Sequence, residues 1–235
     1  MKVYIFTTPS HRFFYDRWFR PSLQTFNPTL EVDMTTYEQV CEDATLNTKG
    51  WLTTMHYKID TILRGIQENM GSSMIHSDID IQFFGDVLPD ITKGLESNDI
   101  VFQKGGRTIC MGFLACRCNQ KTLTFFQTVK EQMIELEKHD EYCAKQLLNL
   151  PPEWYDTKGE APRKYKNSYV TWDYLPMNRF VGGHQVAHST AKSRFKPVSP
   201  DVLMHHATCT VFKYKPKQLE YVRDAMKTKY HKAYE

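Results

Sequence analysis

Met74-Ile75-His76-Ser77-Asp78-Ile79-Asp80-Ile81-Gln82-Phe83-Phe84 is the stretch from which the rest of the chain is interpreted. Its alternation predicts one buried β-strand, with isoleucines on one face and His76, Asp78 and Asp80 on the other. Buried carboxylates this close together repel each other and lose hydration, unless a cation lies between them or one takes a proton. Oxygen ligands favour Mg²⁺ or Mn²⁺, which keep coordination positions open for phosphate oxygens. We therefore predict a metal site for a diphosphate.

The segment before this strand supports the prediction, because an Asp-x-Asp triplet alone is common by chance. Residues 51–70 carry apolar side chains at three- and four-residue steps, which predicts a long amphipathic helix that ends at Gly71. Lys58 lies beside the apolar stripe of this helix. A solvated position is the simpler interpretation of Lys58, and contact with a phosphate is the functional one.

Length and composition indicate a single α/β domain over residues 1–235. With 41% hydrophobic and 24% charged residues, the chain has the composition of a globular protein, and it is short for two enzymatic domains. Its net charge of +3 arises in residues 211–235, where seven lysines and arginines stand against three acidic residues. Because the positive charge is confined to this tail, we expect no nucleic-acid partner.

The amino terminus and the cysteines indicate a cytoplasmic protein. The apolar run Met1–Phe6 is too short for a signal peptide, and no segment approaches the ~20 apolar residues that span a membrane. The six cysteines form no Cys-x-x-Cys pair, so we expect reduced thiols in the core and give zinc second place.

Periodicity divides the remaining chain into further elements. Strands are predicted at 2–8, 30–36, 99–103, 109–117, 168–175 and 202–208. Helices are predicted at 11–20, 89–96, 123–136 and 142–150. The polar, proline-rich residues 151–167 predict a mobile functional loop. Residues 216–235 predict a basic helix that either packs on the domain or lies on an anionic membrane surface.

Polar and aromatic residues beyond the ends of two strands are candidates for binding a nucleotide. Thr7 and Thr8 end the first strand, where an open parallel sheet gathers its ligands; the alternative is a plain turn capped by Ser10. Tyr37 ends the second strand and is either a platform for a base or an ordinary surface tyrosine.

Acidic residues and histidines later in the chain are further candidates. Asp140 either caps the helix that follows it or, with Glu141 as the alternative, acts as a general base on an acceptor. A strand runs into His205 and His206, and its alternation lets only one of them face a metal site. Gly112 lies inside a predicted strand, which indicates either a substrate pocket or a bulge.

In their order along the chain, these residues resemble the nucleotide-diphospho-sugar transferase family. The resemblance covers Ser77-Asp78-Ile79-Asp80, Met111-Gly112-Phe113, Asp140–Asn149 and His206-Ala207-Thr208, and it implies a single glycosyltransferase-A domain with a Rossmann-like mixed central sheet flanked by helices.

The same resemblance assigns roles to several residues. It implies that Asp78, Asp80 and His206 bind Mn²⁺ or Mg²⁺, and that Ser77 and Asp78 meet the diphosphate of the donor. Lys213 and Lys215 are then candidates for a phosphate-binding lysine, and Lys215 forms a Lys-Pro pair with Pro216. The family commonly has Asn-Thr-Gly-Phe at 110–113 and Asp-Gln at 140–141, where this chain differs.

The activity so implied is metal-dependent transfer of a sugar from a nucleotide-diphosphate donor, in particular a UDP-sugar, to a hydroxyl of a glycan or protein acceptor. Two alternatives stay open. One is another metal-dependent enzyme that acts on phosphates, such as a nucleotidyltransferase or phosphatase, and the other is a non-catalytic binding protein on the same fold.

Overall fold

The computed structural model describes residues 1–41, 49–106, 108–150, 165–166, 170–187, 195–208 and 210–231. The predicted loop 151–167 lies outside the described residues, apart from 165–166. Within the described ranges, no helix combines the length and the apolar character needed to cross a lipid bilayer.

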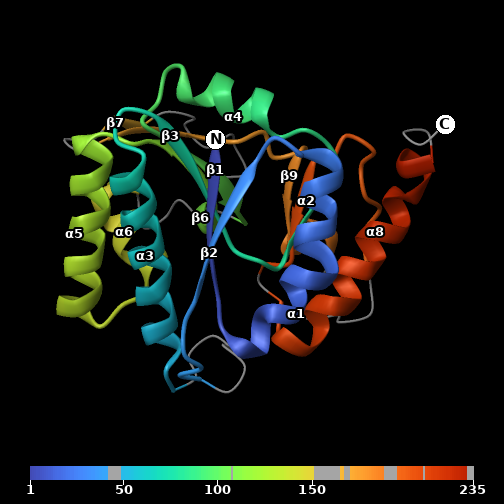
Figure 1. Cartoon of the computed structure of the whole chain (residues 1–235), viewed down its shortest axis with the longest axis horizontal. Coiled ribbons are helices and arrows are strands. Elements are labelled where there is room, and N and C mark those ends of the chain that lie inside the picture. Colours follow the sequence, from blue (N-terminus) through green and yellow to red (C-terminus); the bar gives the residue numbers. More distant parts are fainter. Residues whose placement is uncertain are drawn as a thin grey trace.

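A mixed sheet forms the centre of the protein (Figure 1). Its seven strands are, in spatial order, β2 (Glu31–Thr36), β1 (Lys2–Thr7), β3 (Ser73–Ser77), β6 (Thr108–Arg117), β5 (Ile100–Gly105), β8 (Thr171–Tyr174) and β7 (Tyr165–Lys166). The pairs β1–β2, β1–β3 and β5–β8 are parallel, whereas β6 is antiparallel to both of its neighbours. This arrangement confirms the predicted mixed sheet.

A second, three-stranded sheet contains β4 (Ile81–Phe83), β10 (Met204–His206) and β9 (Phe180–Gly182), in that order. It corrects the prediction of one continuous strand over residues 74–84. The chain leaves the large sheet after β3 and joins the small sheet at β4, so residues 78–80 connect the two. Alternation of apolar residues did not reveal the break, because both halves are buried strands with the same pattern.

Helices cover both faces of the large sheet (Figure 1). In chain order they are η1 (Pro9–His11), α1 (Arg12–Phe14), η2 (Tyr15–Phe19), α2 (Arg20–Phe26), α3 (Trp51–Glu68), α4 (Leu88–Leu95), α5 (Gln120–Leu136), α6 (Asp140–Leu147), α7 (Gly183–Val186), η4 (Phe212–Tyr214) and α8 (Lys215–His231). The predicted helix 11–20 is longer than expected, because Pro21 stands in the first turn of α2, where its missing N–H costs nothing.

The strands divide the core into two layers by alternation. Tyr4, Met74 and Leu114 face α3, α5 and α6, while their neighbours on the strands face α1, α2, α4 and the small sheet. In α3 the buried side chains Ile59, Ile62 and Ile66 repeat at three- and four-residue steps, as the sequence predicts. Both layers end at the carboxyl edge of β1 and β3.

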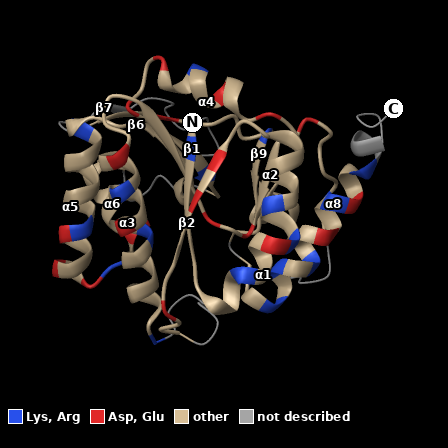
Figure 2. Cartoon of the chain, in the orientation of Figure 1, with Lys and Arg blue, Asp and Glu red and all other residues tan. Residues whose placement is uncertain are grey.

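The carboxyl-terminal helix α8 packs on the domain. Leu219, Val222 and Met226 are at most 2% exposed, and they join the core on the side of the small sheet. The apolar stripe of the predicted basic helix is therefore occupied by the protein itself. Figure 2 shows both Lys/Arg and Asp/Glu positions along α8.

The cysteines within the described residues are free and buried, as the sequence predicts; they are Cys41, Cys110, Cys116, Cys118 and Cys143. Cys209 lies outside the described residues.

Candidate active site

The connection between β3 and β4 carries the two aspartates. It is held from both sides: the Asp78 backbone N–H donates to the Gly112 carbonyl at 2.6 Å, and the Ala207 N–H donates to the Asp80 carbonyl at 3.0 Å. Strands from both sheets thereby fix the backbone that carries the carboxylates. The carboxylates share a site because of this tight connection, and not because they alternate along a strand.

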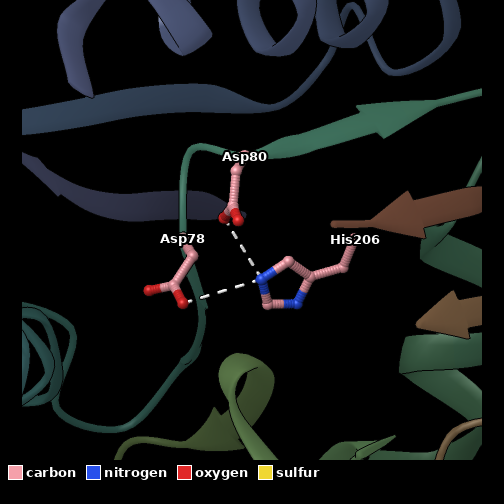
Figure 3. A group of neighbouring side chains, drawn as sticks. All are labelled: Asp78, Asp80 and His206. Atoms are coloured by element: carbon pink, nitrogen blue, oxygen red, sulfur yellow. Dashed lines mark ion pairs between the residues drawn. The ribbon is translucent and has the colours of Figure 1, made fainter. Parts of the chain in front are cut away.

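His206 completes the group (Figure 3). It is the last residue of β10, which pairs with β4 next to Asp80. Its Nε2 lies 3.2 Å from Asp80 Oδ1 and 3.7 Å from Asp78 Oδ2. One ligand atom from each of the three residues lies within 4.8 Å of the others. His205 points away and is fully buried, so His206 is the histidine that faces the aspartates.

This set of donors fits a divalent ion of the Mg²⁺ or Mn²⁺ class. Two carboxylates and one imidazole converge at the floor of a cavity. Mn²⁺ binds carboxylate and imidazole ligands in preference to thiolates. Gly112 keeps the space free. A Cβ at this position would lie 2.4 Å from Asp78 Oδ2 and 2.3 Å from His206 Cε1. The structure supports both predicted roles of Gly112, because it borders the pocket and lies in a bulge between β5 and β6.

Two lysines bind the carboxylates separately. Lys58 Nζ lies 3.1 Å from Asp78 Oδ2, and Lys215 Nζ lies 2.7 Å from Asp80 Oδ2. Lys58 is only 6% exposed, so the interpretation of this residue as a solvated helix lysine is wrong. The helical pattern could not show this, because the end of β3 and the start of α6 enclose the Lys58 ammonium group.

The two carboxylates differ in their acidity. Burial raises the pKa of Asp78, and the nearby Lys58 and His206 offset this only in part. Burial also opposes ionisation of Asp80, but Lys215 and His206 outweigh it and hold the pKa of Asp80 well below its usual range. Asp80 is therefore the more readily ionised member of the pair.

Asp140 and Glu141 lie at the amino end of α6 and line the cavity. The cap of α6 is His139, whose Nδ1 accepts the Tyr142 N–H, so the prediction that Asp140 caps this helix is wrong. Asp140 is buried, with its Oδ2 3.7 Å from Lys58 Nζ. Burial opposes its ionisation, yet Lys58 and His139 lower the pKa of Asp140.

The cavity has a volume of about 680 Å³ and collects most of the residues singled out in the sequence. Those that line it are Thr7, Thr8, Lys58, Asp78, Asp80, Gly112, Asp140, Glu141, His206 and Lys215. Ser10 lies within η1 and does not cap it, so the prediction of a turn capped by Ser10 is wrong.

Three of the predicted ligand-binding residues lie away from the lining. Ser77 is buried in β3 and its hydroxyl donates to the Asp78 carbonyl at 2.8 Å. Tyr37 stacks on Tyr57 with ring centroids 4.2 Å apart. Lys213 is exposed and extends over the Tyr214 ring.

The cavity also contains residues that the sequence did not single out. His139 and Trp51 form one wall, with ring centroids 5.4 Å apart, and Lys145 binds Glu141 there at 2.9 Å. His11 and Phe212 form part of the opposite wall. A histidine directly before Asp140 was visible in the sequence, whereas the other contacts depend on helices that meet only in the folded chain.

The mixed sheet and its flanking helices have the architecture of the glycosyltransferase-A fold. The chain belongs to the nucleotide-diphospho-sugar transferase family, whose family model matches residues 22–219. This confirms the resemblance seen in the sequence. A search of curated protein sequences finds no match.

Solved glycosyltransferases share the fold at low sequence identity. GlyE from Streptococcus pneumoniae has a TM-score of 0.56 and 12% identity, over 99% of this chain and 63% of its own. The present chain therefore spans less than two thirds of that protein. The galactosyltransferase LgtC, solved with donor and acceptor sugar analogs, has a TM-score of 0.52 and 10% identity over 94% of this chain. The bifunctional glycosyltransferase WbbM has a TM-score of 0.53 and 8% identity.

Proposed function

We propose that this protein transfers a sugar from a nucleotide-diphosphate donor, in particular a UDP-sugar, to a hydroxyl of a glycan or glycoprotein, with Mn²⁺ or Mg²⁺ as cofactor. The observation that carries the proposal is the convergence of Asp78, Asp80 and His206 at the floor of a cavity of about 680 Å³. Membership in the family supports a nucleotide-sugar donor. The solved complex of LgtC with donor and acceptor sugar analogs is consistent with it.

The residues of the cavity suit the separation of charge in such a transfer. Asp78, Asp80 and His206 would hold the divalent ion, which would supply positive charge to the departing diphosphate. Lys215 stands beside Asp80 at the edge of the site, where its ammonium group adds positive charge for a phosphate oxygen. Thr7 and Thr8, at the carboxyl end of β1, offer backbone groups to the nucleoside.

Two acidic residues are candidates for the base that activates an acceptor hydroxyl. The Asp140 side chain is 3% exposed and faces Lys58, whereas the Glu141 side chain is 29% exposed beside Lys145. We assign the base to Glu141 if the anomeric configuration inverts, because this carboxylate is accessible from the cavity. If the configuration is retained, the reaction needs no dedicated base.

Two-metal phosphate chemistry has less support. It needs further carboxylates close to the first pair. Asp140 and Glu141 share the cavity, but Asp140 is paired with Lys58 at 3.7 Å and Glu141 with Lys145 at 2.9 Å. Asp90 is engaged by Arg179 at 2.7 Å, and neither Asp90 nor Asp86 lines the cavity.

Calorimetry with UDP, in the presence and absence of Mn²⁺, tests the proposal. We expect UDP to bind tightly only with Mn²⁺, and the Asp80→Ala variant to lose this metal-dependent binding while its circular dichroism stays unchanged. Asp86→Ala is the matched control, because Asp86 is exposed and outside the cavity. UDP affinity that is indifferent to Mn²⁺ would favour the non-catalytic alternative. Soaking crystals with several sugar nucleotides would then identify the donor.

A further inference from the structure

A bulge in the central sheet places a buried glutamine behind the metal site. In β5, Phe102 pairs with Leu114, but the next residue, Gln103, pairs with Cys110. Residues 111–113 of β6 therefore have no partner on β5. The bulge lets the Gly112 carbonyl accept the Asp78 N–H on one side, while Gln103 approaches the site from the other.

Gln103 contacts His206 directly. Its Oε1 lies 2.9 Å from His206 Nδ1, and Gln103 itself is fully buried. A carboxamide oxygen can only accept, so His206 Nδ1 is the donor in this hydrogen bond. A neutral imidazole that carries its proton on Nδ1 has its lone pair on Nε2. Nε2 is the atom that faces Asp78 and Asp80.

We propose that Gln103 is a positioning residue, which holds His206 in the ring orientation and tautomer that present Nε2 to a divalent ion. The inference rests on the metal site of the proposed function. Metal-binding histidines in general donate their second ring N–H to a neighbouring acceptor, and this partner fixes the tautomer.

The chemistry of the glutamine suits this position. Asp78, Asp80 and Asp140 already place three carboxylates in the buried site. A carboxamide accepts the His206 N–H without adding a fourth negative charge. Gln103 Nε2 is buried and has no hydrogen-bond partner among the described residues. Hydrogen bonds of the amide nitrogen therefore do not explain why a glutamine is buried at this position.

The neighbouring histidine provides an internal comparison. His205 also contacts a buried glutamine, but here the amide nitrogen Nε2 of Gln82 approaches His205 Nδ1, at 3.4 Å. The same Gln82 nitrogen donates to the Leu219 carbonyl at 2.8 Å. Neither residue lines the cavity. Gln82 therefore has the size and burial of Gln103 without a connection to His206.

Three variants separate positioning from mere packing. Gln103→Met keeps the volume and removes the acceptor, Gln103→Glu keeps an acceptor oxygen, and Gln82→Met is the matched control. The measurement is Mn²⁺ affinity without nucleotide, together with the melting temperature of each variant. We expect Gln103→Met to weaken Mn²⁺ binding about 10- to 100-fold. Gln103→Glu should retain more Mn²⁺ affinity than Gln103→Met, because it keeps the acceptor oxygen, but its added buried charge should lower the melting temperature. Gln82→Met should alter the melting temperature only.

The inference is overturned if Gln103→Met binds Mn²⁺ as the wild type does, or if Gln103→Glu and Gln82→Met lose as much affinity as Gln103→Met. Failure of the wild type itself to bind Mn²⁺ would instead refute the proposed function. Should Gln103→Met not fold, long-range ¹⁵N–¹H spectra of the Mg²⁺-loaded wild type decide the question. A proton on His206 Nδ1 supports the inference, and a proton on Nε2 overturns it.

Discussion

Lys215 donates a hydrogen bond of 2.7 Å to Asp80 Oδ2, although the two residues lie 135 positions apart in the chain. The ammonium group thereby binds a carboxylate that is also a predicted metal ligand. Lys215 is the first residue of α8, and the buried stripe of that helix holds it in place. The same lysine can therefore compete with the metal for the Asp80 carboxylate, and its positive charge can also attract a diphosphate.

Replacing Lys215 by glutamine should have opposite effects on the two ligands. Without nucleotide, Mn²⁺ affinity should rise up to about fivefold, because a partly exposed ion pair contributes about 1 kcal/mol. UDP affinity in saturating Mn²⁺ should fall, because a positive charge next to the diphosphate is lost. Calorimetry with each ligand measures both. Lys213→Gln is the control, and a parallel fall of both affinities in Lys215→Gln would contradict this view.

Lys58 lies between the partly buried carboxylate of Asp78 and the buried carboxylate of Asp140. In Lys58→Met both would be left without their buried counter-charge, so we expect a loss of about 3 kcal/mol in the free energy of unfolding, measured with urea. The double variant Lys58→Met/Asp140→Asn removes one of these charges and should recover part of the loss. If the changes in the free energy of unfolding caused by the two substitutions are additive, Lys58 and Asp140 are not coupled.

The elements that local periodicity defines were predictable from the sequence. The helix expected at 51–70 is present as Trp51–Glu68. The candidate pair Asp78 and Asp80 was predictable because these residues are close along the chain. The break after Ser77 was not, since each half of the stretch has the alternation of a buried strand.

Contacts between distant segments were beyond the reach of local patterns. The burial of Lys58 depends on α6, and the hydrogen bond between Gln103 and His206 depends on a bulge in the opposite strand. The strand predicted at 99–103 was expected to end at Gln103, whereas β5 continues to Gly105. A bulge of this kind has no signature in the alternation of a single strand.

Gly112→Ala should block the metal site. The new methyl group would lie 2.4 Å from Asp78 Oδ2 and 2.3 Å from His206 Cε1, so both ligands must move apart. We expect Mn²⁺ affinity to fall by an order of magnitude or more, because positions of metal ligands tolerate only small shifts. Gly94→Ala is a matched control, since its methyl group would press on Val101 instead. It should lower the melting temperature and leave Mn²⁺ affinity intact.

Asp99→Asn should reveal an acid-sensitive contact between β5 and β8. Asp99 Oδ2 accepts from the Thr171 N–H at 2.9 Å and from the Thr171 hydroxyl at 3.0 Å. Burial opposes its ionisation, but these hydrogen bonds outweigh burial and lower the pKa of Asp99 below its ordinary 3.8. Because the folded pKa is the lower one, the stabilisation is complete above pH 3.8 and is lost as the pH falls through the folded value.

At pH 7 the free energy of unfolding of the Asp99→Asn variant should therefore be about 1.5–3 kcal/mol lower than that of the wild type. The charged acceptor is replaced by an amide, whose NH₂ group must in part face a donor. The difference from the wild type should shrink as the pH falls below 3.8, which urea unfolding at a series of pH values measures. Asp224→Asn provides the control, because the Asp224 side chain is 57% exposed and is paired with Lys227 on the surface of α8. A difference that is independent of pH would show that the charge of Asp99 does not contribute, because the charged carboxylate accepts from the Thr171 donors more strongly than the neutral form does.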